Sequence, residues 1–148
     1  MRLARLNVYA PTNSNGSDSA KSGFYRAITK AIQALKKTPK FKIVSLGDFN
    51  ATVSSQSKSS GAWDNVLGHN NPDRVTTNDN GERFLQWCLK NQMKIVNSMF
   101  RSKRIHRETW KNSVSGKWKR IDYICITAWV GPEICSILPS VYRTIQNI

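Results

Sequence analysis

A carboxylate and a carboxamide, Asp48 and Asn50, stand two residues apart in the stretch GDFN, directly after an apolar run. Two more polar groups close apolar runs: Tyr9 in NVYAPT and Asp122 in RIDYI. A carboxylate can bind a divalent cation or hold a water molecule, and amide or phenol donors can stabilise charge on phosphate oxygens. Each group alone has an ordinary alternative. Asn50 could bond its own backbone in a turn, Tyr9 could be a half-buried strand aromatic, and Asp122 could pair with a neighbouring cation.

The first half of the chain predicts a strand, a helix and a second strand. Residues 2–9 form an apolar strand, which Pro11 ends, and residues 22–37 carry apolar side chains at helical spacing. Residues 41–46 predict a buried strand. The connection is long enough for a crossover, so the two strands are predicted to be parallel or mixed neighbours.

The second half begins with a long polar segment, of the kind that is usually functional or mobile inside a domain. No internal repeat and no domain boundary is visible, and the pattern weakens after residue 127. The predicted elements are a polar loop over 52–80, a helix over 80–93 capped by Asp79 or Asn80, a short strand over 94–100, and a hairpin of 108–110 with 118–127.

The candidate chemical groups should meet at one end of the sheet. Successive strand side chains point to opposite faces, so Asp48 and Asn50 can share one face while Phe49 takes the other. Tyr9 and Asp122 also lie at the ends of strands. We therefore expect Tyr9, Asp48 and Asp122 to form one cluster.

The charge favours a polyanionic partner. The 148 residues include 23 Lys and Arg against 9 Asp and Glu, a net charge of +14. Residues 101–120 hold much of this excess, with two tryptophans between the charges, which favours nucleic acid because neutralised phosphates release counterions. An acidic membrane surface or mere solubility remain alternatives. The candidate nucleic-acid-binding residues are Arg101, Lys103, Arg104, Arg107, Trp110, Lys117, Trp118, Lys119 and Arg120.

The sequence predicts an intracellular protein with no membrane partner, and the nucleus is one candidate compartment. No run approaches the roughly 20 apolar residues of a membrane span, and the first residues lack the apolar core of a signal peptide. The three cysteines, Cys88, Cys125 and Cys135, are odd in number and lack paired metal spacing. They are predicted to be reduced and packed.

In this order, NVYAPT, GDFNA and RIDYI resemble the endonuclease/exonuclease/phosphatase superfamily. The stretches NDNGERFLQWCLKNQMKIVNSMF and IHRETW narrow the resemblance to the endonuclease domain of non-LTR (LINE-type) retrotransposons and craniofacial development protein-like relatives. The resemblance covers about 7–126, and 127–148 diverge. It implies an α/β fold, part of a four-layer α/β/β/α sandwich of two mixed sheets with outer helices, lacking the first half and the last strand.

The resemblance also implies Mg²⁺-dependent phosphodiester cleavage. Asp48 would then activate water and belong to the metal site, Asn50 and Tyr9 would contact the phosphate, and Asp122 would orient a catalytic histidine. The family's metal-binding Glu and its Ser-Asp-His motif have no match here, and neither His69 nor His106 matches the catalytic position. Asp48 alone is a weak, incomplete Mg²⁺ site.

We therefore expect residues 1–148 to be one partial domain, a truncated phosphodiesterase domain of a retrotransposon-derived DNA endonuclease with impaired catalysis. The alternatives are a non-catalytic basic nucleic-acid-binding remnant and a gene-model fragment of a longer reverse-transcriptase/endonuclease protein; whether the chain is an enzyme stays open. A missing first half would leave an apolar sheet face uncovered, which predicts marginal stability and self-association. Its candidate residues are Ile43, Val44, Leu46, Ile95 and Ile124.

Overall fold

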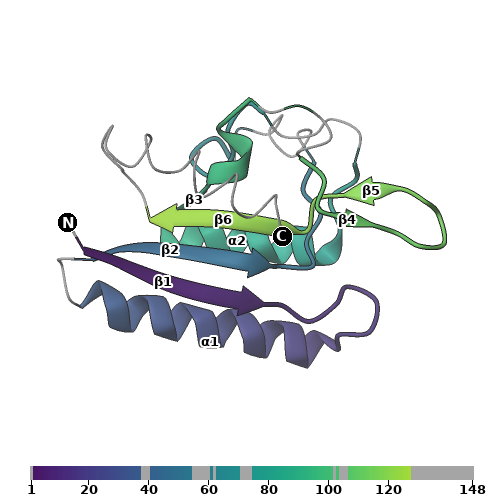
Figure 1. Cartoon of the computed structure of the whole chain (residues 1–148). Coiled ribbons are helices and arrows are strands. Elements are labelled where there is room, and N and C mark those ends of the chain that lie inside the picture. Colours follow the sequence, from purple (N-terminus) through teal and green to yellow (C-terminus); the bar gives the residue numbers. More distant parts are fainter. Residues whose placement is uncertain are drawn as a thin grey trace.

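A four-stranded mixed sheet carries two helices, and a separate two-stranded hairpin lies beyond one of its ends (Figure 1). The structure is a computed structural model and describes residues 2–37, 41–54, 61, 63–70, 75–101, 103 and 107–127. The predicted α/β class is confirmed. The elements are β1 (Arg2–Tyr9), α1 (Asp18–Lys36), β2 (Phe41–Asp48), α2 (Asp79–Asn91), β3 (Met93–Ile95), the 3-10 helix η2 (Val96–Ser98), β4 (Trp110–Lys111), β5 (Trp118–Lys119) and β6 (Asp122–Thr127).

The strand order of the larger sheet is β1-β2-β6-β3. β1 and β2 run parallel, with α1 as the crossover between them, and β6 runs antiparallel to both β2 and β3. The prediction that the first two strands are neighbours is confirmed. β2 continues two residues beyond its predicted end, so Gly47 and Asp48 belong to the sheet rather than to a loop.

Helix α1 begins four residues before its predicted start. The Ser17 side chain accepts a hydrogen bond from the Ala20 N–H at 3.1 Å and caps the helix there. Its apolar face packs on the sheet through Ile28 and Ile32, both buried. The residues from Asp18 to Lys21, which lie before the predicted start, form the first turn of the helix.

Helix α2 is capped by Asn78, so the prediction of Asp79 or Asn80 as the cap is wrong. The Asn78 Oδ1 accepts the Gly81 N–H at 2.8 Å. Asp79 instead forms salt bridges with Lys21 and Arg83, and Asn80 is buried. Tertiary contacts, which the local sequence does not show, select among three adjacent residues that can all cap a helix.

The predicted strand over 94–100 is wrong beyond Ile95, where η2 begins. The Asn97 Oδ1 accepts the backbone N–H of Ile124 at 2.7 Å, and the Ser98 hydroxyl donates to the Ile95 carbonyl oxygen at 2.6 Å. These side chains satisfy backbone groups at the strand end and replace the continuing ladder.

The predicted hairpin is confirmed by the pairing of Trp110 with Lys119. Its second strand is shorter than predicted, because the chain leaves the hairpin after Lys119 and enters the larger sheet as β6. The segment 118–127 therefore contributes one strand, β5, to the hairpin and another strand, β6, to the larger sheet. This arrangement places the hairpin beside the end of β2 at which Asp48 lies (Figure 1).

The two faces of the larger sheet carry different apolar clusters. On the helix side, Phe49 and Phe84 are fully buried in a cluster that includes both Ile43 and Ile95. On the other face, Val44 and Ile124 are also buried, and Leu46 is half-buried. The prediction that these residues share one uncovered face is therefore wrong, and self-association stays a prediction. Among the described residues, no helix is long and apolar enough to cross a membrane.

Candidate functional site

Tyr9, Asp48 and Asp122 form one row across three neighbouring strands. Tyr9 lies opposite Asp48 in the β1–β2 register, and Asp48 lies opposite Asp122 in the β2–β6 register. Directly opposed residues of neighbouring strands point to the same face of a sheet, here the face away from the helices. The predicted convergence of these three residues is confirmed, and their chemical roles remain predictions.

A glycine allows the close approach of β1 and β2 beside this row. Gly47 has a φ of +139°, and a Cβ at this position would lie 2.1 Å from the Val8 carbonyl oxygen. Residues with a Cβ rarely adopt this backbone conformation, and here the added atom would also collide with the neighbouring strand. The glycine at position 47 therefore allows the two strands to approach closely enough for Tyr9 and Asp48 to lie opposite each other.

The GDFN segment is both the end of a strand and a turn. Asn50 has a φ of +47°, and its backbone N–H donates to the Asp48 Oδ1 at 2.7 Å. Its side-chain Nδ2 donates to the Ala10 carbonyl oxygen at 2.8 Å, which fastens the chain leaving β1. Phe49 points into the helix-side core with no exposed surface, as predicted. The sequence allowed a turn at Asn50 as an alternative to a functional site. In the structure this turn is present, and it holds the residues of the site in position.

Two asparagines that sequence reasoning did not place in the site fasten this turn from the start of α2. The Asn80 Nδ2 donates to the backbone oxygens of Pro11, at 2.9 Å, and Asn50, at 3.1 Å. The Asn78 Oδ1 accepts the backbone N–H of Thr52 at 2.9 Å. The available signal was the clustering of asparagines in NDN before an apolar helix, which indicates caps and loop contacts.

Two residues of the row, Tyr9 and Asp48, face a cavity of about 610 Å³ between the sheet end and the hairpin, whereas Asp122 is not among its lining residues. Tyr9, which is 74% exposed, lines it together with Asp48 and Asn50. The hairpin contributes Trp110 and Lys119, so an aromatic surface and a cation face the polar row. The remaining lining residues are Thr12, Asn13, Ser14, Thr52, Asn78, Asn112 and Ile121.

A second cavity of about 610 Å³ lies on the hairpin and carries Lys117 and Trp118, and it shares Lys119 with the first. The Lys111 ammonium lies 5.9 Å from the centre of the Trp118 ring, within cation–π range. Four residues of the basic stretch therefore line the two cavities at the hairpin: Trp110, Lys117, Trp118 and Lys119.

The other predicted nucleic-acid-binding residues differ in exposure. Arg101 and Lys103 are exposed, Arg107 is half-buried, and Arg104 lies outside the described residues. Arg120 is only 3% exposed, and its Nε donates to the Arg107 carbonyl oxygen at 2.7 Å. The interpretation of Arg120 as a surface phosphate contact does not fit this geometry, because its guanidinium points into the protein.

The electrostatics of the row disfavour the charged form of the Asp48 carboxyl. Burial raises the pKa of Asp48, the nearby Asp122 raises it further, and the hydrogen bond from the Asn50 N–H lowers it. Like charges directly opposite each other destabilise a sheet. The row is therefore an arrangement that costs the fold some stability, as polar sites commonly do.

We predict that Asp48→Asn stabilises the fold at neutral pH. Because the pKa of Asp48 is raised in the folded chain, the free energy of unfolding falls as pH rises through that pKa. The amide removes the charge and keeps an oxygen for the Asn50 N–H. We expect the melting temperature at pH 7 to rise by about 1–3 °C, a small effect because the carboxyl is partly solvated. Below the ordinary pKa of 3.8 the parent and the variant should melt alike, and an equal gap at both pH values would contradict this.

In the described part of the chain, no group of three or more His, Cys, Asp or Glu side chains is placed to hold a metal ion. His69 is exposed and does not line the cavity, and His106 lies outside the described residues. Cys88 and Cys125 are buried and unbridged, with their sulfur atoms 3.9 Å apart, as predicted. Cys135 lies outside the described residues.

The fold and the row define a mixed α/β domain with a polar site at a sheet end beside a basic hairpin. The chain is similar to craniofacial development protein 2 of Bos taurus, with 31% identity over 131 residues, which cover 86% of this chain and 20% of that protein. The chain thus spans about a fifth of the length of the curated relative that it matches. No family model matches the chain, and no solved structure matches it.

Proposed function

We propose that this chain is a DNA-binding domain related to the endonuclease/exonuclease/phosphatase superfamily and derived from a retrotransposon endonuclease. In this proposal the Tyr9–Asp48–Asp122 row receives a backbone phosphate, and the hairpin contacts the flanking strand. The observation that carries it is the row itself, two of whose residues, Tyr9 and Asp48, line a cavity together with Lys119 and Trp110. The net charge of +14 and the similarity to craniofacial development protein 2 support it.

Each residue of the row has a chemical part in this proposal. The exposed Tyr9 hydroxyl donates to a phosphate oxygen, and Asn50 offers the amide hydrogen that Ala10 does not use. Asp48, with its raised pKa, accepts a proton from an attacking water. Lys119 and Trp110 hold the neighbouring nucleotides through charge and stacking.

The adjacent carboxylates of Asp48 and Asp122 fit a weak Mg²⁺ site. Mg²⁺ takes one or two carboxylates together with substrate phosphate oxygens, and a bound ion would neutralise the repulsion within the row. One Asp48 oxygen already accepts the Asn50 N–H, which leaves few protein ligands. When bound, the ion would polarise the phosphate and favour deprotonation of water.

We propose that cleavage by these 148 residues is slow. The lining of the cavity contains no histidine among the described residues, so the group that Asp122 would orient in the family resemblance is not part of that lining. Removing one charge-stabilising donor from an active site typically lowers the rate about 100- to 1,000-fold. The proposed present role is therefore recognition of the DNA backbone with little turnover.

The test combines binding with cleavage on the same preparation. We expect a labelled 20-base-pair duplex to bind with an affinity that falls steeply with salt, as phosphate contacts require. Supercoiled plasmid with Mg²⁺ should be nicked at no more than about a hundredth of the rate of a complete endonuclease domain, and Asp48→Ala should change this little. If the parent nicks at the complete domain's rate and Asp48→Ala does not, the chain is an active nuclease. Absence of binding at low salt would refute the DNA-binding proposal.

A further inference from the structure

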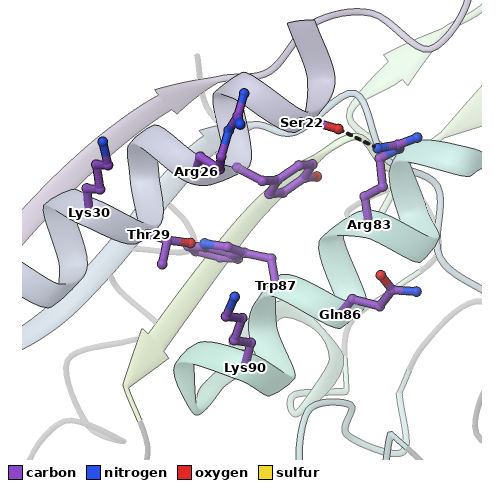
Figure 2. A pocket seen from close by; sticks show the side chains of 9 residues that line it. Ser22, Arg26, Thr29, Lys30, Arg83, Gln86, Trp87 and Lys90 are labelled. Carbon is purple, nitrogen blue, oxygen red and sulfur yellow. Dashed lines mark hydrogen bonds between the residues drawn. The ribbon is translucent and has the colours of Figure 1, made fainter. Parts of the chain in front are cut away.

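The two helices enclose another recess, which lies on the opposite side of the sheet from the polar row. Helices α1 and α2 are joined by a hydrogen bond from the Lys36 ammonium to the Asn91 carbonyl oxygen, 2.9 Å, and by the Lys21–Asp79 salt bridge. Between them lies a groove of about 390 Å³ (Figure 2). We call it the α1–α2 groove. Its lining residues are Ser22, Tyr25, Arg26, Thr29, Lys30, Arg83, Gln86, Trp87 and Lys90.

All the charged side chains that line the α1–α2 groove are positively charged. Arg26 and Lys30 rise from α1 and Lys90 from α2, and all three are exposed (Figure 2). Among the described residues, no acidic side chain forms a salt bridge with any of them. The groove therefore presents three uncompensated cations from two helices.

Two acidic residues at the N-terminal ends of the helices are already paired with cations. Asp79 forms salt bridges with Lys21 and Arg83, and Asp18 forms one with Arg83. These contacts close the N-terminal end of the helix pair, and the hydrogen bond from the Arg83 Nη1 to the Ser22 hydroxyl adds to them (Figure 2). Arg26, Lys30 and Lys90 therefore remain available to an anionic ligand from another molecule.

A buried donor without an acceptor lies in the same groove. Trp87 is 4% exposed, and its indole Nε1–H has no hydrogen-bond partner among the residues that the structure describes. Figure 2 shows the Trp87 ring lying between the helices, and Tyr25 of α1 also lines the groove. A buried N–H left unpaired is unfavourable and rare in native proteins, and an acceptor from a ligand would satisfy it.

We propose that the α1–α2 groove binds an acidic, linear peptide segment of a partner protein. Carboxylates of the peptide pair with Arg26, Lys30 and Lys90, and an apolar side chain or backbone carbonyl of the peptide reaches the Trp87 edge of the groove. The choice of a peptide follows from size and chemistry. A DNA duplex is too wide to enter a groove of about 390 Å³ between two helices, whereas an extended peptide fits and supplies both acceptors and apolar contact.

The experiment follows the Trp87 indole resonance in the ¹⁵N-labelled full chain. The probe is the peptide Ac-DEDFEDE-amide, and the control peptide replaces every acid with Asn or Gln. We expect saturable binding at 150 mM salt with a shift of the Trp87 signal, which Trp87→Phe assigns by removing it. The double variant R26E/K30E should weaken binding at least tenfold. The matched control R5E/K117E has the same charge change on residues outside the groove and should bind within twofold of the parent.

Each remaining outcome decides against the groove or against the peptide. Equal weakening by both double variants, or binding without a Trp87 shift, would mean non-specific charge attraction and overturn the proposal. A tighter response to inorganic pyrophosphate would make the groove a small-anion site, and a Trp87 shift on adding duplex DNA would make it part of the DNA surface. Binding of DNA by R26E/K30E is a separate measurement, so failure here leaves the proposed DNA-binding function untouched.

Discussion

Phe49→Ala is expected to lower the free energy of unfolding by about 3–5 kcal/mol, the range for removing a large aromatic side chain from a core. The Phe49 ring has no exposed surface. Its centre lies 4.3 Å from that of Phe84, 5.8 Å from Trp87 and 6.3 Å from Tyr123. These partners come from α2 and β6, so the variant loses the contacts that join the helix layer to the sheet. The loss is a large fraction of the roughly 5–15 kcal/mol by which native domains are stable.

Urea unfolding followed by circular dichroism measures this effect. Phe49→Leu, which keeps most of the volume, should lose much less than the alanine variant. Val114→Ala, at a residue that is 95% exposed on the hairpin, should change stability by less than about 0.5 kcal/mol. If Phe49→Ala unfolds within 1 kcal/mol of the parent, the packing of Phe49 between the sheet and α2 is incorrect.

Phe49 also shows why the polar row could be predicted from the sequence. Residues alternate across a strand, so the buried Phe49 indicates that the preceding Asp48 points to the other face, whereas Asn50 lies in the turn after β2. The strand ends were visible from the apolar runs, and parallel pairing of β1 with β2 then brings Tyr9 opposite Asp48. The alternation of side chains along β2 and the pairing of the strands therefore agree, and the predicted convergence of Tyr9, Asp48 and Asp122 is confirmed.

The same alternation explains one error of the sequence analysis. Ile43 and Val44 are consecutive in β2, so they cannot lie on one face, and the structure places them in separate clusters. Burial of Arg120 could not be read from charge, because a basic stretch does not show which side chain turns inward. The sequence likewise did not indicate that the cations of the α1–α2 groove could form a binding surface, because exposed Lys and Arg on helices are ordinarily solvated.

The hairpin lysines provide the sharpest test of the proposed DNA surface. Lys117 and Lys119 line the cavities beside the polar row, and each is expected to neutralise one phosphate. We predict that K117E/K119E weakens duplex binding at low salt by about 10- to 100-fold. The plot of log affinity against log salt should become shallower by about 1.8, since each phosphate contact contributes about 0.9 to the slope.

The matched control for this prediction is R26E/K30E, which changes the net charge by the same amount on the helix side of the sheet. If the affinity depends only on net charge, both variants should lose binding equally, at every salt concentration. If the hairpin forms the DNA surface, the helix variant should keep nearly the parent slope, because exposed charges farther apart than the Debye length of about 8 Å at 0.15 M salt are largely screened. Equal loss in both variants would mean that the hairpin is no more than part of a generally basic protein, and the polar row would then lack a DNA surface beside it.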